Sequence, residues 1–160
     1  MLPPREQGDV GELSALYWLA SRGAQVAIPI GNNSHWDLVA EHDGALLRVQ
    51  VKTCTCLVKS RWAVTLSTRG GNRSRNGLVE RLDASRFDYL FVLVGNGRRW
   101  FIPSGRVAGV SHLRLGGRKY ADFEVERGEP IRDRTAQYPT STIALPDSRG
   151  DVRVAKGAAL

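Results

Sequence analysis

The chain has 160 residues, a net charge of +7 and 42 % apolar residues, which fits one globular domain with a buried core. No apolar run approaches the ~20 residues of a membrane span, and the N-terminus lacks the apolar centre of a secretory signal. These features predict a cytoplasmic protein without a membrane contact. Two cysteines are also too few for a disulfide framework.

The first predicted element is an amphipathic helix over residues 9–22. Its apolar face is expected to carry four side chains with helical spacing: Leu13, Leu16, Tyr17 and Ala20. Asp9 is a natural N-cap and Gly23 a natural stop. Glu12, three residues after Asp9, completes a capping box, so a purely structural role for this glutamate is one open interpretation.

A short strand over residues 25–30 precedes a predicted β-hairpin over residues 35–53, which reads HWDLVAEHDGALLRVQVKT. Its apolar residues alternate on both sides of Asp43-Gly44, a sequence typical of a type I′ turn. With that turn, paired residues have numbers that sum to 87, so Leu38 faces Val49 on an apolar side. The hairpin therefore has a defined register.

The other side of this hairpin carries polar residues. Asp37 lies opposite Gln50, with Cβ atoms expected roughly 5 Å apart, and Lys52 shares the face of Gln50. Asp, Gln and Lys are ordinary on a solvent-facing strand, which is one interpretation. The strands are apolar enough to be half covered, however, and a partly buried lysine requires a partner such as Asp37. A functional site is the second interpretation.

The same kinds of pattern predict the later elements. A strand over residues 61–67 is followed by a glycine- and arginine-rich loop over 68–77 and a short helix over 78–87. A buried strand over 88–94 then forms a second hairpin with a strand over 98–103, and a helical turn begins at Ser104. Asp88 is expected to form structural hydrogen bonds, and Trp62 and Trp100 to fill the core rather than stack on bases. The order of elements predicts an α/β fold around a mixed sheet. We expect one domain over residues 1–125 and a low-complexity tail over 126–160.

The positive charge is concentrated in one segment. Residues 44–79 contain no Asp or Glu but seven basic residues: Arg48, Lys52, Lys59, Arg61, Arg69, Arg73 and Arg75. The remaining 16 basic residues equal the 16 acidic ones. Such a block is typical of a surface that binds a polyanion, although a solvated basic face is the simpler alternative.

Cys54 and Cys56 are separated by one residue, which is too short for an easy disulfide. A zinc site with His35, His42 or His112 lacks the usual paired ligand spacing. We therefore expect these cysteines to be ordinary strand residues, with metal or redox chemistry as the alternative.

A helix with Glu12, then a hairpin with Asp37 on one strand and Gln50-Val51-Lys52 on the next, resembles the PD-(D/E)XK nuclease superfamily. The stretches RGAQVAIPIGNNSHWDLV and FDYLFVLVGNGRRWFIPSGRV extend the likeness over residues 8–110. They are similar to a branch with group I intron homing endonucleases and archaeal Holliday-junction resolvase-like proteins. The sequence departs from the signature at Trp36, where proline is usual, and at Gln50, which replaces the second acidic residue.

This resemblance implies a restriction-endonuclease-like αβββαβ core, with a mixed central sheet flanked by helices. It also implies Mg²⁺-dependent hydrolysis of DNA phosphodiester bonds, with Mn²⁺ as a substitute ion. The implied catalytic residues are Asp37, Gln50, Lys52 and Glu12, and the implied metal ligands are Asp37, Gln50 and the Val51 carbonyl. Lys52 is expected to stabilise the transition state and orient the attacking water.

The acid-free segment is expected to bind double-stranded DNA through six residues: Lys59, Arg61, Arg69, Asn72, Arg73 and Arg75. The alternative for the loop at 68–77 is a flexible surface. Cutting both strands with one small site implies a homodimer or homotetramer. Three functions remain open: a site-specific homing-type endonuclease, a structure-specific nuclease of the junction-resolvase or repair type, and a catalytically inactive DNA-binding module of the same fold.

Overall fold

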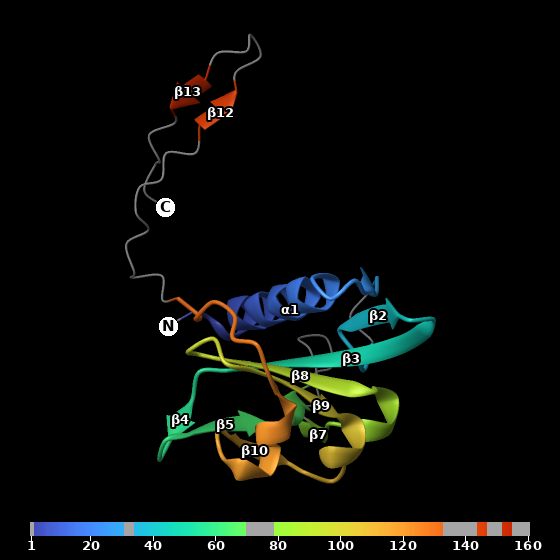
Figure 1. Cartoon of the computed structure of the whole chain (residues 1–160). Coiled ribbons are helices and arrows are strands. Elements are labelled where there is room, and N and C mark those ends of the chain that lie inside the picture. The colour runs from blue at the N-terminus through green and yellow to red at the C-terminus, as the bar shows by residue number, and fades with distance from the viewer. Residues whose placement is uncertain (1, 31–33, 70–78, 133–143, 147–151, 155–160) are drawn as a thin grey trace. The chain divides into compact units, whose positions relative to one another are not determined.

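A computed structural model describes residues 2–30, 34–69, 79–132, 144–146 and 152–154 (Figure 1). Residues Leu2–Ile131 form one compact unit, and the chain from Arg132 onward groups separately. In the C-terminal unit, β12 (Ala144–Pro146) and β13 (Val152–Val154) pair as an antiparallel two-stranded sheet. The larger unit contains the candidate site and is described below. No helix in the described ranges is long and apolar enough to cross a membrane.

Helix α1 extends over Pro4–Ala20 and begins five residues before the predicted start. Proline is well suited to the first turn, because its missing N–H has no acceptor there. Asp9 consequently lies inside the helix, and the predicted capping box with Glu12 is wrong. The predicted stop is confirmed: Gly23 has φ 83°, and the Ala24 N–H donates to the Leu19 carbonyl at 3.2 Å.

The buried face of α1 differs from the predicted one. Leu13 and Tyr17 are 64 % and 71 % exposed, and the buried residues of the helix are Gly11, Ala15, Trp18 and Leu19. Two of these are too small to stand out in a hydrophobicity pattern. They allow the helix to approach the sheet closely, and this close approach decides which face is buried.

The main sheet has six strands in the order β1-β2-β3-β8-β9-β11. Their bounds are β1 Gln25–Ala27, β2 Leu38–His42, β3 Ala45–Cys54, β8 Tyr89–Val94, β9 Arg99–Pro103 and β11 Glu124–Val125. Only β3 and β8 pair in parallel; the other neighbours are antiparallel. Figure 1 shows α1 over one face of this sheet. The predicted α/β fold with a mixed central sheet is confirmed.

The β2–β3 hairpin has the predicted register, with Leu38 opposite Val49. Asp43 and Gly44 have φ values of 51° and 79°, as a type I′ turn requires. Val49 and Leu38 are fully buried against α1, together with Phe91 of the central strand β8. The hairpin is therefore fixed by both its turn and its apolar side.

A second sheet, β10-β5-β4, covers the other face of the main sheet. Its strands are β4 Leu57–Val58, β5 Arg61–Thr65 and β10 His112–Leu115. The core between the sheets contains Trp62 and the fully buried Trp100, so the prediction that both tryptophans fill the core is confirmed.

The helix predicted over residues 78–87 is wrong. Its first residues form β7 (Val79–Arg81), which pairs with β6 (Ser67–Arg69), and only one 3₁₀ turn follows, η1 (Ala84–Arg86). Asp83 caps that turn by accepting the Ser85 N–H at 3.0 Å. Two more 3₁₀ segments are η2 (Ser104–Arg106) and η3 (Arg118–Phe123). Within the described ranges, α1 is thus the one α-helix that flanks the sheet.

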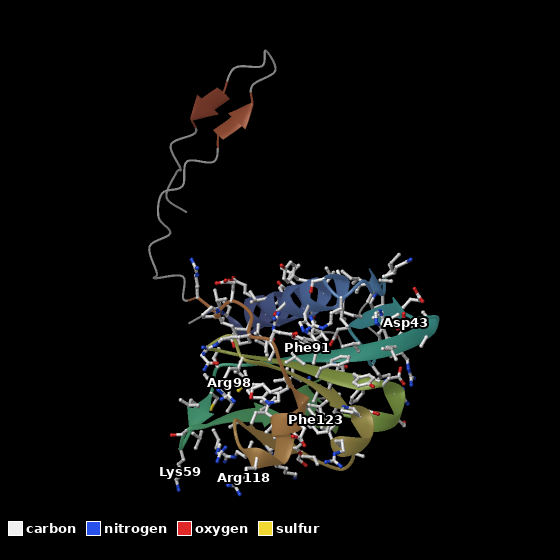
Figure 2. The ribbon with its side chains drawn as sticks, viewed as in Figure 1. Asp43, Lys59, Phe91, Arg98, Arg118 and Phe123 are labelled. Atoms are coloured by element: carbon white, nitrogen blue, oxygen red, sulfur yellow. The ribbon has the colours of Figure 1, made fainter. Side chains whose placement is uncertain are left out.

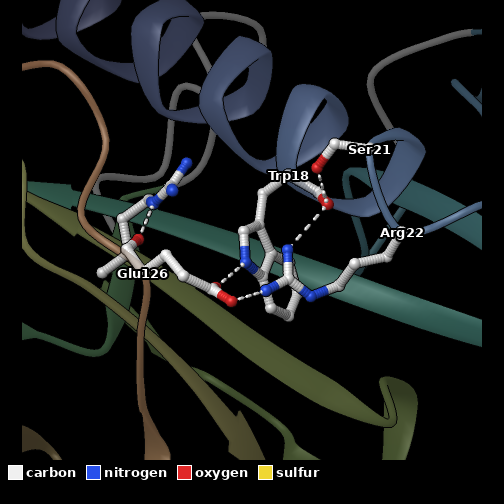
Figure 3. Close-up of polar contacts among 5 residues, drawn as sticks. Trp18, Ser21, Arg22 and Glu126 are labelled. Carbon is white, nitrogen blue, oxygen red and sulfur yellow. Dashed lines mark hydrogen bonds and ion pairs between the residues drawn. The ribbon is translucent and has the colours of Figure 1, made fainter.

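Glu126 directly follows β11 and connects the chain there to the end of α1 through polar contacts (Figure 3). Its carboxylate accepts the Trp18 Nε1–H at 2.8 Å and forms an ion pair with Arg22. Its backbone carbonyl accepts the Arg99 Nε–H at 2.6 Å. The Trp18 hydrogen bond, with the neighbouring Arg22, lowers the pKa of Glu126 to about 2. The compact unit therefore uses a residue beyond position 125.

Candidate active site

Asp37 lies where β2 begins to pair with β3. Its backbone N–H donates to the Val49 carbonyl at 2.9 Å. Its carboxylate atom Oδ2 accepts the Val51 N–H at 2.7 Å and Gln50 Nε2 at 2.5 Å. The Asp37 side chain thus takes the place of a backbone acceptor at the edge of β3. This arrangement fixes its direction more firmly than one flexible contact would.

Gln50 is a buried polar residue, 6 % exposed. Besides Asp37, its Nε2 approaches the Val51 carbonyl at 3.4 Å. Both contacts use the amide nitrogen, which therefore faces the Asp37 carboxylate and the Val51 carbonyl. For the amide oxygen Oε1 to bind a cation together with these two groups, the amide would have to turn over.

Lys52 and Asp37 interact electrostatically in a partly dehydrated setting. Burial raises the pKa of Asp37, against the lowering effects of the Val51 N–H, Lys52 and Gln50. Burial lowers the pKa of Lys52, and Asp37 opposes this change. Dehydration is the largest influence on both groups, so each gains from an additional charged partner.

Glu12 reaches the same site from α1. Burial raises its pKa first, and the neighbouring Asp37 and Asp9 carboxylates raise it further. The influence of Asp37 shows that two carboxylates lie near each other. The Asp37 charge thus disfavours ionisation of Glu12, and a bound cation would relieve this effect.

The oxygen atoms gathered here fit a hard divalent ion. Mg²⁺ prefers carboxylate, carbonyl and water oxygens, which Asp37, Glu12, Gln50 and the Val51 carbonyl offer. Residues in the described ranges bring no three His, Cys, Asp or Glu side chains together. The usual zinc ligand set is therefore missing there, and a Mg²⁺ ion at this place would have at most two carboxylates, with neutral oxygens as its other ligands. Cys54 and Cys56 are free thiols.

The predicted DNA-binding residues that the structure describes lie on other elements than these site residues. Lys59 occupies the turn between β4 and β5, and the exposed Arg61 begins β5. Arg69 ends β6. Asn72, Arg73 and Arg75 lie outside the described residues.

Asp88 has the structural role that the sequence predicts. Its carboxylate accepts the Arg48 backbone N–H at 2.7 Å, and Arg48 Nε and Nη2 at 3.1 and 3.0 Å. These bonds connect the start of β8 to β3.

Sequence reasoning missed the contact that brings Glu12 to the site. Gly11 of α1 lies against Thr53 and Val51 of β3, and a Cβ on Gly11 would lie 2.0 Å from Thr53 Oγ1. The signal in the sequence is a glycine inside a helix, where it is normally unfavourable, directly before a site residue.

A mixed sheet that presents Asp37, Gln50 and Lys52 beside a helical glutamate is the architecture of a nuclease class. The chain belongs to the PD-(D/E)XK endonuclease family, whose sequence model matches residues 3–122. It is also similar to the structure of a bacterial homing endonuclease, I-Ssp6803I, at 25 % identity and a TM-score of 0.61. That match covers 71 % of this chain and 78 % of the other. No curated protein sequence matches significantly.

Proposed function

We propose that the protein is a Mg²⁺-dependent endonuclease that hydrolyses phosphodiester bonds in duplex DNA at specific sites, as homing-type enzymes do. The observation that carries this proposal is the Asp37 carboxylate, which Val51 and Gln50 hold beside the partly buried Lys52. The family and the homing endonuclease of similar structure support the same activity.

Asp37, Gln50 Oε1 and the Val51 carbonyl are the proposed ligands of Mg²⁺, and Glu12 adds a second carboxylate to this set. Mn²⁺ has the same preference for oxygen ligands and is the expected substitute. When bound, such an ion neutralises charge on the scissile phosphate and lowers the pKa of an attacking water.

The side chains around this ion have separate tasks. The Lys52 ammonium donates hydrogen bonds to a phosphate oxygen, where negative charge increases as water attacks phosphorus and the bridging P–O bond breaks. A compact ammonium suits this position, because it places a full charge at one point. Gln50 holds the Asp37 carboxylate in one direction through its 2.5 Å hydrogen bond.

Substrate binding is assigned to the residues of the basic segment: Lys59, Arg61, Arg69, Asn72, Arg73 and Arg75. Cleavage of both DNA strands by one small site per chain requires more than one copy, so we propose a homodimer or homotetramer.

A plasmid-nicking assay tests the activity, with Mg²⁺ or with EDTA. Wild type should nick only with Mg²⁺. Asp37→Asn should lose at least about 100-fold in rate, whereas Asp43→Asn, a matched carboxylate on the same hairpin, should keep the rate. Lys52→Met should also lose activity, and the exposed Lys119→Met should not.

Wild-type protein that binds DNA but cleaves no faster than Asp37→Asn would leave only the inactive DNA-binding module. Comparing linear duplex with four-way junctions then tests the specificity. Preferential cutting of junctions would identify a structure-specific nuclease and contradict the homing-type assignment.

A further inference from the structure

Basic residues in the described part of the chain differ in the partners of their charged groups. Four arginines form ion pairs: Arg22 with Glu126, Arg48 with Asp88, Arg86 with Asp83 and Arg98 with Glu124. Other exposed basic residues of the larger unit form no ion pair with a described residue. Arg106 and Lys119 lie over the rings of Phe123 and Tyr120, Arg127 donates to the Asn96 carbonyl, and Arg5 lies on α1. The four that are left are Lys59, Arg61, Arg114 and Arg118, and we call them the basic cluster. The first three belong to the second sheet or to its β4–β5 turn, and Arg118 begins η3, shortly after β10.

A contact between β5 and the segment after β10 brings members of this cluster together. The guanidinium of Arg61 lies against Gly117, where a Cβ would be only 2.0 Å from Nη1 and 2.6 Å from Cζ. Any other residue at position 117 would displace this guanidinium. Lys59 lies two residues before Arg61, and Arg118 directly follows Gly117. Figure 2 shows the side chains of Lys59 and Arg118 projecting from the same end of the larger unit.

The turn between β4 and β5 keeps Lys59 at its tip against a backbone preference. Lys59 and Ser60 both have positive φ, 47° and 61°, where Asn and Gly are strongly favoured. A lysine here costs backbone free energy, and such positions concentrate at functional sites. In return, the long Lys59 side chain extends into solvent from the tip of the turn.

Arg114 adds a positive charge on the outward face of β10. It pairs with Ala63, which shares a face of β5 with Arg61, while the alternate residues Trp62 and Leu115 face the core. No Asp or Glu occurs in residues 44–79 or 89–121, which include the strands of this sheet and the turns beside them; Asp122 follows in η3, four residues after Arg118. The strands and turns that carry Lys59, Arg61 and Arg114 therefore supply no neutralising residue, and a polyanion would relieve the repulsion among these charges.

We propose that the basic cluster binds the phosphate backbone of duplex DNA and holds the substrate, in addition to the phosphate at the candidate active site. The choice of DNA as the polyanion rests on the proposed function. Phosphate contacts of this kind position a duplex but do not identify bases.

The test is the salt dependence of DNA affinity, measured by fluorescence anisotropy with a labelled duplex in EDTA. Each lost phosphate contact reduces the slope of log K against log salt by about 0.9. The double variant Lys59→Asn/Arg118→Gln should reduce this slope by about 2. Asparagine is chosen at position 59 because it tolerates the positive φ of this turn. Arg5→Gln/Arg127→Gln removes two exposed charges elsewhere and should leave the slope unchanged.

Gly117→Ala provides a second variant without a charge change. It should weaken binding at least about threefold by displacing Arg61, with circular dichroism showing that the fold is kept. A wild-type slope in Lys59→Asn/Arg118→Gln overturns the proposal. If that slope falls but wild type never cleaves DNA, the proposed function fails while this surface stands. If wild type cleaves and the slope is unchanged, only this inference fails.

Discussion

Gly11 of α1 touches Thr53 of β3 so closely that a Cβ on Gly11 would lie 2.0 Å from Thr53 Oγ1 and 3.3 Å from Thr53 Cβ. The residues next to this contact are Glu12 and Lys52, which both belong to the candidate active site. The contact therefore sets the distance between the helix and the strand that together form the site.

Gly11→Ala should destabilise the protein by about 1–3 kcal/mol, because the added methyl group overpacks this contact. Cleavage should fall at least about tenfold as Glu12 moves away from Asp37, since small displacements at active sites are costly. Gly8→Ala is the matched control: a Cβ there meets nothing within 4 Å, and the change should stabilise by about 0.5–1 kcal/mol. Urea denaturation and the nicking assay measure both effects.

Removing the Thr53 hydroxyl should rescue this defect. Thr53 Oγ1 is buried without a hydrogen-bond partner in the described structure, so losing it costs little. Gly11→Ala/Thr53→Ala should therefore recover activity, whereas Gly11→Ala/Thr53→Val, which keeps the volume, should not. Equal activity in the two double variants would contradict a steric cause.

The hairpin and the Asp37–Gln50 contact follow from local rules. The Asp43-Gly44 turn and the period-2 apolar pattern leave one register, which the structure has. The buried face of α1 could not be predicted, because Gly11 and Ala15 are buried for their small size rather than their hydrophobicity. Helical periodicity over residues 78–87 failed for a different reason: pairing between β6 and β7 overrides the local propensity.

Activity should depend on pH within a narrow range. Burial raises the pKa values of Asp37 and Glu12 and lowers that of Lys52. In the proposed mechanism, cleavage requires both carboxylates to be ionised and Lys52 to be protonated. As pH falls, activity should therefore be lost at a pH above the usual pKa range of carboxyl groups. As pH rises, it should be lost at a pH below the usual pKa range of lysine. The profile of kcat/KM against pH measures these limits.

More Mg²⁺ should move the acid limit to lower pH, because the ion competes with protons for the carboxylates. An acid limit that does not depend on Mg²⁺ would contradict carboxylate ligation of the ion.

Asp37→Asn/Lys52→Met should be at least as stable as wild type at pH 7 without metal, by up to about 1–4 kcal/mol. Because the folded-state pKa of Asp37 is raised, its stabilising contribution is full below the unfolded pKa and is lost as pH rises through the folded pKa. The folded-state pKa of Lys52 is lowered, so its stabilising contribution is present above the unfolded pKa and is lost as pH falls through the folded pKa. Both charges are therefore unfavourable near neutral pH, and the double variant removes both.

Lys52→Met alone leaves Asp37 without its cation and should be less stable than the double variant. Guanidinium denaturation at pH 7 compares the three proteins. A double variant clearly less stable than wild type would show that the pair stabilises the fold.

The compact unit should need residues beyond the predicted boundary at 125. A chain of residues 1–131 retains the Glu126 contacts with Trp18, Arg22 and Arg99, and should melt at a higher temperature than a chain of residues 1–125. Glu126→Ala in the longer chain removes the side-chain contacts but keeps the backbone contact with Arg99. Its melting temperature should lie between those of the two truncated chains. Equal melting temperatures for the two truncations would favour the boundary at 125.

The central claim is that Asp37 and its neighbours bind a divalent metal ion beside Lys52. Anomalous diffraction from crystals soaked in Mn²⁺ tests it most directly. We expect a peak next to the Asp37 carboxylate and the Val51 carbonyl, and no peak there in Asp37→Asn crystals. A map in which Mn²⁺ binds only elsewhere, with the space beside Asp37 empty, would contradict the account.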